Sequence, residues 1–261
     1  MSIQPVRFPQ PDRFFISGKT TAFGIGCFPG ISGMSFGKDG VLYVVERGNH
    51  LVRAISSDGI VSTLAGNGSS GYSDGDLLLA QFHQPRSIVY DDGILKGHPV
   101  LLRSDGVGKI IRLIDLQEET VSTFAGTYTI GQTFAKDGPA NDAVFAYPDD
   151  IIVREDGVVF ATDRFADAIR MISSGTDIQR RTVSTYAGTG PGPNFRPVNI
   201  AAKQLMVQPN GMAFGSDGAI YFADEGNHQV RRIRETDGIP IVEFVAGDRW
   251  DKNAAYADGP P

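Results

Sequence analysis

The chain has 261 residues, a formal net charge of −6 and a pI near 5.2. An acidic chain lacks the overall positive field with which nucleic-acid-binding proteins attract phosphates. Its single cysteine, Cys27, excludes an intrachain disulfide. No apolar run approaches the ~20 residues that span a bilayer, and the N-terminus lacks the apolar segment of a signal peptide. These features favour a soluble protein in the cytoplasm.

One pattern occurs four times along the chain. In each copy an acid ends a strand-like segment, and an arginine follows seven residues later. A β-rich segment ending in Ala-Gly comes next, as VSTLAG, VSTFAG, VSTYAG and VEFVAG. The acids and arginines are Glu46 and Arg53, Asp105 and Arg112, Asp163 and Arg170, and Asp224 and Arg231. Chance does not keep three features in order four times, so the chain is built from internal repeats.

In chain order, prolines punctuate residues 1–18, which we expect to run extended. The repeats follow at about 31–66, 85–126, 148–188 and 209–247, and residues 248–261 begin a further connection. In the first copy, alternation and turn residues predict strands at 31–36, 41–46, 51–55 and 61–66, with a turn at Asp39-Gly40. An insertion at residues 95–100 lengthens the first hairpin of the second copy, and we expect it to be a surface excursion.

Four-stranded antiparallel units at regular spacing predict an all-β fold, a β-propeller in which each repeat is one blade. A solenoid is the alternative, because its units also contact only their neighbours. Residues 19–24 resemble a fourth strand without its first three, and residues 255–261 resemble the start of a connection. We therefore expect residues 19–261 to form a propeller that is incomplete or closed by further sequence, since closure removes exposed sheet edges.

The repeated motif resembles the NHL repeat. The last copy carries it as Pro209-Asn210-Gly211-Met212, Tyr221-Phe222-Ala223-Asp224, Asn227-His228 and Val230-Arg231. The resemblance covers residues 31–261 approximately and implies a β-propeller. NHL-type propellers include protein-binding scaffolds, RNA-binding domains and relatives among metal-dependent lyases and lactonases, so the resemblance selects no activity.

The repeated acid and arginine are expected to be structural. In a hairpin with a four-residue loop they are diagonal neighbours on one face of the sheet, where a charge-assisted hydrogen bond can join them. Catalysis needs unlike groups whose pKa values differ, whereas each copy repeats the same pair. No catalytic residue is therefore predicted among them.

Functional residues are expected where the copies differ. The start of the first strand and the end of the second lie at the same end of a blade, around the mouth of the channel, where ligands commonly bind. The turn at this place is Ser32-Gly33, Arg86-Ser87, Asp149-Asp150 and Asn210-Gly211 in successive copies. The predicted ligand-binding residues are Arg86, Asp149, Asp150 and Asn210.

Two functions follow from these residues. The favoured interpretation is a non-catalytic scaffold that presents the channel face to a protein or a small ligand and needs no cofactor. The alternative is a metal-dependent lyase or hydrolase in which Asp149, Asp150 and Asp163 hold Ca²⁺ or another divalent cation. The favoured interpretation of Asp149-Asp150 is instead a solvated loop or a partner for Arg86 or Arg103.

A nucleic-acid partner is not expected. Arg231, Arg232 and Arg234 are divided between two strand faces by the alternation of side chains, and no stacking aromatic residues interleave with them.

Overall fold

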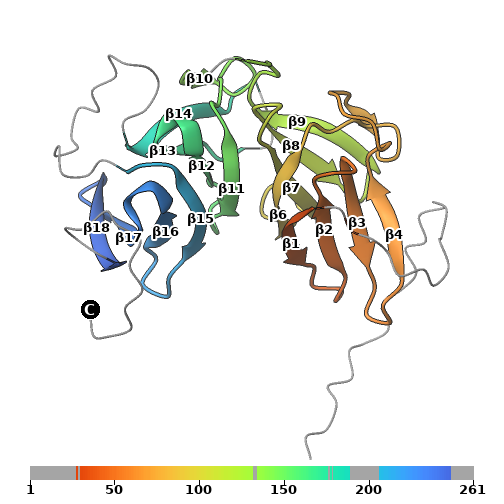
Figure 1. Ribbon diagram of the computed structural model, residues 1–261, viewed down its shortest axis with the longest axis horizontal. Coiled ribbons are helices and arrows are strands. Elements are labelled where there is room, and N and C mark those ends of the chain that lie inside the picture. The colour runs from red at the N-terminus through yellow and green to blue at the C-terminus, as the bar shows by residue number, and fades with distance from the viewer. Residues whose placement is uncertain are drawn as a thin grey trace, which may run out of the picture.

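The computed structural model describes residues 28, 30–131, 134–175, 177, 179–188 and 206–247. These residues form four antiparallel sheets, each built on four consecutive strands. The sheets are the blades of a β-propeller and lie side by side in an arc, with the first and fourth blades at its two ends (Figure 1). The all-β propeller prediction is confirmed.

The strands follow the predicted repeats. Blade 1 consists of β1 (Ile31–Phe36), β2 (Leu42–Glu46), β3 (Leu51–Ile55) and β4 (Val61–Ala65). Blade 2 consists of β6 (Pro85–Asp92), β7 (Pro99–Asp105), β8 (Ile110–Asp115) and β9 (Thr120–Ala125). Blade 3 consists of β11 (Pro148–Val153), β12 (Val159–Asp163), β13 (Ala168–Ile172) and β14 (Thr182–Gly188). Blade 4 consists of β15 (Pro209–Phe214), β16 (Ile220–Asp224), β17 (Gln229–Thr236) and β18 (Ile239–Gly247).

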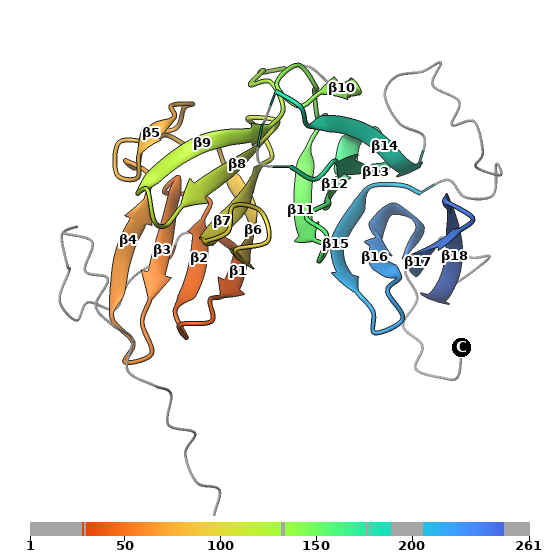
Figure 2. The same ribbon diagram turned by 180° about the vertical axis from the view of Figure 1, so that it is seen from behind.

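Short elements belong to the connections and loops. The two-residue strands β5 (Gly75–Asp76) and β10 (Gly138–Pro139) come from the connections that precede blades 2 and 3. They pair with the outer strands β9 and β14, so each connection crosses the outer edge of its blade before entering the inner strand (Figure 2). Two 3₁₀ turns, η1 (Arg164–Ala166) and η3 (Glu225–Asn227), follow the second strands of blades 3 and 4.

An Asp-Gly turn closes the first hairpin in three blades. Gly40, Gly157 and Gly218 have φ angles of 78°, 82° and 76°, in the left-handed region that favours glycine. The aspartate before each glycine accepts a hydrogen bond from the amide two residues after itself, at 3.1, 3.1 and 3.2 Å. This Asx turn holds the hairpin in register.

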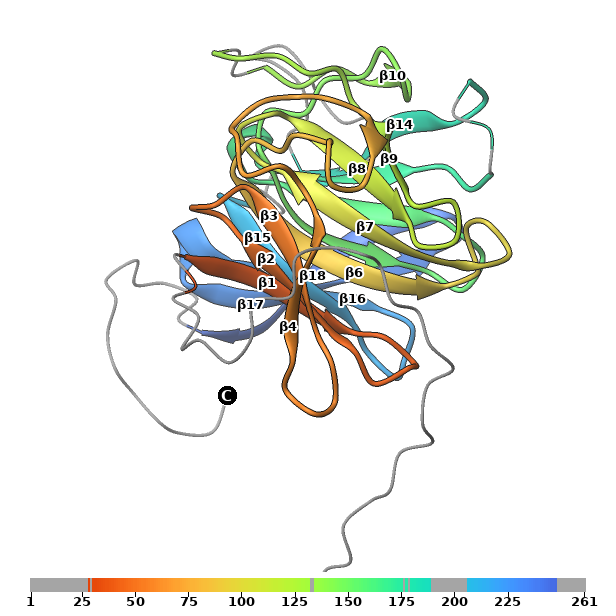
Figure 3. The same ribbon diagram turned by 90° about the vertical axis from the view of Figure 1, so that its right-hand side faces the viewer.

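Apolar side chains between neighbouring blades form the core. Ile88 packs between blades 1 and 2, Ile151 between blades 2 and 3, and Met212 between blades 3 and 4. The innermost strands β1, β6, β11 and β15 are neighbours in that order, and Figure 3 shows β1 beside β6. A blade thus buries its apolar faces against the blades beside it, as a layered domain requires.

The insertion at residues 95–100 reaches the surface at Gly97 and Pro99, as predicted, but it is anchored in the core at Leu95, which the prediction missed. Leu95 is 3% exposed and lies in the core between blades 2 and 3. Its amide donates to Oδ2 of Asp91 at 2.9 Å, which folds the insertion back over the sheet. The sequence showed how long the insertion is, but not that one of its side chains packs into the core.

In blades 2, 3 and 4 the repeated acid holds the segment that enters the first strand of its blade. Asp163 is fully buried and accepts hydrogen bonds from the amides of Ala146, at 2.9 Å, and Tyr147, at 2.7 Å. Asp105 accepts from the amide of His83 at 3.0 Å, and Asp224 from that of Val207 at 2.7 Å. The carboxylate therefore joins the end of the second strand to the start of the first.

The repeated arginine lies beside the acid in three blades. The nitrogen–oxygen distance is 3.8 Å for Glu46 and Arg53, and 3.0 Å both for Asp163 and Arg170 and for Asp224 and Arg231. Arg170 also bonds Asp137 of the preceding connection at 2.5 Å. The arginine therefore links the blade to the connection that precedes it.

Blade 2 departs from the expected pairing of Asp105 with Arg112. Asp105 instead lies 3.2 Å from Arg103, and Arg112 bonds Asp74 of the preceding connection at 2.5 Å. Arg103 is opposite Arg112 in the sheet and is fully buried. The equivalent position in the other copies is Val44, Ala161 or Phe222, so blade 2 is the copy that has a second arginine able to take the place beside the carboxylate.

Three predicted features cannot be placed. Residues 1–18, 19–24 and 248–261, which carry the extended segment and the two partial repeats, lie outside the described residues. Among the residues that are described, no helix is long and apolar enough to cross a membrane.

The buried pair in blade 3 predicts a large loss of stability when its arginine is replaced. Arg170→Met leaves Asp163 as a buried charge without its cation, and we expect a loss of about 3 kcal/mol or more in the free energy of unfolding. The matched control is Arg154→Met, which breaks an exposed pair with Asp156 and is expected to cost less than ~1 kcal/mol. Urea unfolding followed by circular dichroism measures both. Equal small losses would contradict the structural role.

Burial of Leu95 predicts a cavity effect. Leu95→Ala is expected to lower the free energy of unfolding by about 2–5 kcal/mol. Leu79→Ala, whose leucine is 66% exposed, is expected to change it by less than ~0.5 kcal/mol. If the two variants unfold at the same urea concentration, Leu95 is not a core residue.

Candidate functional site: the channel mouth

The innermost strand of every blade is irregular at the same place. Regular pairing with the second strand is interrupted after Ile31, Pro85, Pro148 and Pro209. Such a bulge leaves extra residues out of the ladder and turns their side chains in a new direction. The bulged residues are Ser32, Arg86-Ser87, Asp149-Asp150 and Asn210-Gly211, and in blade 1 Gly33 is already paired with Val45. With Gly33, these are the positions at which the four copies differ.

The four bulges surround one cavity of about 560 Å³, which we call the channel mouth. Its wall includes all of the bulged residues and Arg47, which follows β2. The structure thus brings together Arg86, Asp149, Asp150 and Asn210, one or two from each of three blades. Arg47 was not among the predicted site residues, although its position after the repeated acid also differs between copies.

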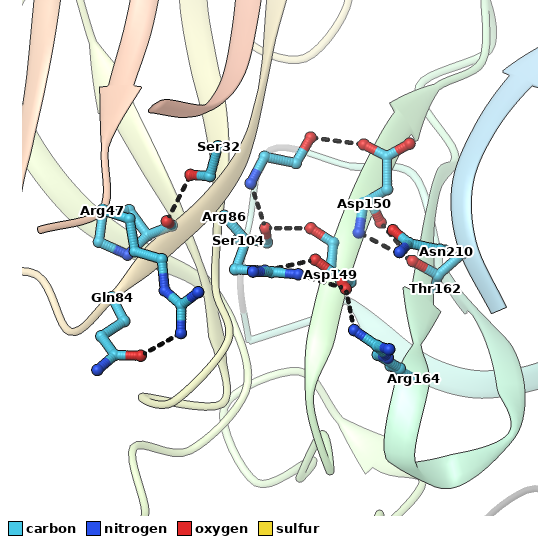
Figure 4. Close-up of polar contacts among 12 residues, drawn as sticks. Ser32, Arg47, Gln84, Arg86, Ser104, Asp149, Asp150, Thr162, Arg164 and Asn210 are labelled. Atoms are coloured by element: carbon cyan, nitrogen blue, oxygen red, sulfur yellow. Dashed lines mark hydrogen bonds and ion pairs between the residues drawn. The ribbon is translucent and has the colours of Figure 1, made fainter. Parts of the chain in front are cut away.

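Arg86 and Asp149 form a bidentate pair across blades 2 and 3. Nε and Nη2 of the arginine donate to the two carboxylate oxygens at 2.7 and 3.0 Å (Figure 4). Asp149 is 5% exposed, and Arg164 approaches it at 3.9 Å. The hydrogen bond to Asp149 raises the pKa of Arg86 above its ordinary value. Both charges are therefore held in place and largely offset.

Asp150 connects three blades. Its Oδ1 accepts from the hydroxyl of Ser87, at 2.5 Å, and from the amide of Ile151, at 3.0 Å. Its Oδ2 accepts from the amide of Met212 at 2.7 Å. Burial raises the pKa of the Asp150 carboxyl, against the opposing effect of these hydrogen bonds. The side chain acts as a bridge from blade 3 to blades 2 and 4.

Two hydroxyls behind the bulges complete this network and were not predicted. Ser104 accepts from the amide of Ser87 at 2.9 Å and donates to the carbonyl oxygen of Asp149 at 2.6 Å. Thr162 accepts from the amide of Asp150 at 2.8 Å. Both residues directly precede a repeated acid, so the signal available in the sequence was a hydroxyl at that position in copies two and three.

Gly33 lets the inner strands of blades 1 and 2 approach each other. A Cβ atom at this position would lie 2.7 Å from the carbonyl oxygen of Arg86 and 2.9 Å from the Cα of Ser87. Beside it, the Ser32 hydroxyl donates to the carbonyl oxygen of Pro85 at 2.8 Å. The glycine is therefore required by packing at the mouth.

Asp149, Asp150 and Asp163 do not form the cation site of the alternative interpretation. Asp149 accepts hydrogen bonds from Arg86, and Asp150 accepts them from three donors. Asp163 accepts them from the amides that enter the first strand and is paired with Arg170. Within the described part of the chain, no group of three His, Cys, Asp or Glu side chains is placed to hold a metal ion. These carboxylates do not fit Ca²⁺, which needs several oxygen ligands directed at one point.

The arginines of β17 face acidic partners. Arg231 is paired with Asp224, Arg232 lies 2.6 Å from Glu243, and Arg234 lies 3.1 Å from Asp217. Their charges are offset within the blade, so this strand does not present an uncompensated basic strip.

Comparisons with known proteins agree with the repeat and the fold. No protein-family model matches the chain. NHL repeat-containing protein 2 from Bos taurus is 23% identical over 238 residues, which cover 83% of this chain and 31% of that protein. The chain thus spans about a third of the length of this curated relative.

Solved structures show the same architecture. An auxiliary nutrient binding protein from Bacteroides ovatus has a TM-score of 0.56 at 16% identity, over 78% of this chain and 48% of that one. A gluconolactonase from Xanthomonas campestris has a TM-score of 0.51 at 15% identity, over 84% and 63%. At these identities the likeness shows the fold alone. The repeated motif, the curated relative and the blades together support the resemblance of this chain to NHL-repeat β-propellers.

Proposed function

We propose that this propeller is a non-catalytic binding protein that holds a small ligand at the channel mouth. The observation that carries the proposal is the set of bulges, because every blade directs its least repeated residues into one cavity. The repeated residues, by contrast, are used within the blades.

The size and wall of the cavity suit a small ligand. A volume of about 560 Å³ lies in the range of small-molecule pockets, ~300–1,000 Å³. Apolar Ile31, Met34 and Ile88 share the wall with Arg47 and Asn210. Most of the wall is polar or glycine, so the cavity offers more hydrogen-bonding groups than the usual apolar pocket. A protein partner would instead need roughly 800 Å² of surface on each side.

The contacts of the carboxylates favour binding over catalysis. A general acid or base must reach the proton that it transfers, yet both oxygens of Asp150 already accept hydrogen bonds from the protein. Asp149 is held by two nitrogens of Arg86. These interactions make the mouth rigid, and rigidity lowers the ordering cost of binding.

Blocking the mouth provides a test. Ligand-observed NMR with a library of small fragments is expected to find ligands for the wild-type protein, and Asn210→Trp is expected to lose them because the indole fills the cavity. Ser57→Trp adds the same side chain to an exposed turn at the opposite end of blade 1 and is expected to keep them. Fragments that bind Asn210→Trp as well as the wild type would contradict a site at the mouth.

The contacts of the carboxylates also predict the response to Ca²⁺. Addition of CaCl₂ in the millimolar range is expected to leave the melting temperature unchanged, because a ligand stabilises a protein only when it binds the folded state. Differential scanning fluorimetry measures this. A rise in melting temperature that disappears in Asp150→Ala would support the metal-dependent alternative.

A further inference from the structure

The arginines at the channel mouth differ in their partners. Arg86 is paired with Asp149, and Arg164 with Glu225 at 2.8 Å. The guanidinium of Arg47 donates to the amide oxygen of Gln84, at 2.8 Å, and among the described residues no carboxylate lies within ion-pair distance of it. Arg47 is therefore the cation of the cavity wall whose charge is not offset by a neighbouring acid.

The acids at the mouth are in the opposite situation. Each oxygen of Asp149 accepts from Arg86, and each oxygen of Asp150 accepts from at least one donor. A cationic ligand would compete with these donors for the carboxylates. An anionic ligand would instead meet a guanidinium that has further N–H groups to donate, and a guanidinium matches a carboxylate in a bidentate geometry.

The rest of the wall indicates what the anion is attached to. Ile31 and Met34, which line the cavity from β1, are 47% and 61% exposed. Covering such side chains with an apolar ligand body is favourable, because it removes apolar surface from water. The mostly polar wall thus combines one guanidinium that no neighbouring acid offsets with two exposed apolar side chains of the same blade.

We propose that the ligand of the channel mouth is a small organic carboxylate, with Arg47 binding the carboxylate group and the side chains of β1 contacting its carbon body. The inference rests on the proposed function and adds the chemical class of the ligand. Arg86 does not share this role because Asp149 already occupies two of its nitrogens.

A matched set of probes tests the ligand class. Benzoate, benzamide and benzylammonium share one ring and differ in charge, and inorganic phosphate supplies an anion without an apolar body. Ligand-observed NMR is expected to show benzoate binding about tenfold more tightly than benzamide, with no binding of benzylammonium, because one charge-assisted interaction accounts for about that factor. Arg47→Gln is expected to remove the preference. Arg180→Gln, whose arginine side chain is 91% exposed, is expected to retain it.

The outcomes separate this inference from the proposed function. If the three ring compounds bind equally and are lost in Asn210→Trp but not in Arg47→Gln, the carboxylate class is wrong and the binding site stands. If phosphate binds as tightly as benzoate, the class is an inorganic anion rather than an organic carboxylate. If none of the four probes binds while the fragment library still yields ligands that Asn210→Trp loses, the carboxylate class is wrong and the binding site stands. The melting temperature of Arg47→Gln is the control that the variant is folded.

Discussion

A buried carboxylate at the end of each second strand is the interaction on which the rest of the structure depends. In blade 3, Asp163 accepts hydrogen bonds from two amides of the segment that enters the first strand, and Arg170 offsets its charge. Pro148 begins the strand directly after those amides, and the bulge follows. The hydrogen bonds of Asp163 thus set the position of Asp149 and Asp150 at the channel mouth, although neither residue takes part in them.

The residues that build the blades are therefore different from the residues that vary between blades. The acid and its strand-entry contacts recur between blades, so the backbone approaches the channel in a similar way each time. The bulged residues are released from the ladder, so their side chains can differ without loss of sheet hydrogen bonds. Blade 1 has Ser32 and Gly33 at this place, and blade 3 has Asp149 and Asp150. Blades with a similar backbone therefore contribute different side chains to the wall of the channel mouth.

Sequence reasoning predicted the parts that depend on local pattern. Strands β1 and β3 begin and end where alternation and turn residues placed them, and the four variable turns meet in one cavity as the hairpin order required. It did not predict that Arg103 displaces Arg112 from Asp105 within blade 2, or that Leu95 turns into the core between blades 2 and 3. The first depends on which side chain fills the space beside a buried carboxylate, and the second on the distance between sheets. A repeat pattern in one chain contains neither.

The central claim is that the bulges, and not the most regular residues of the repeat, face the ligand. Chemical-shift mapping of the ¹⁵N-labelled protein with benzoate tests it most directly. The account predicts that the amides that shift most belong to the four bulges, from Ser32-Gly33 to Asn210-Gly211, together with Arg47. Shifts centred on the Asp-Gly turns at the opposite end of the blades, such as Asp39-Gly40 and Asp217-Gly218, would contradict it.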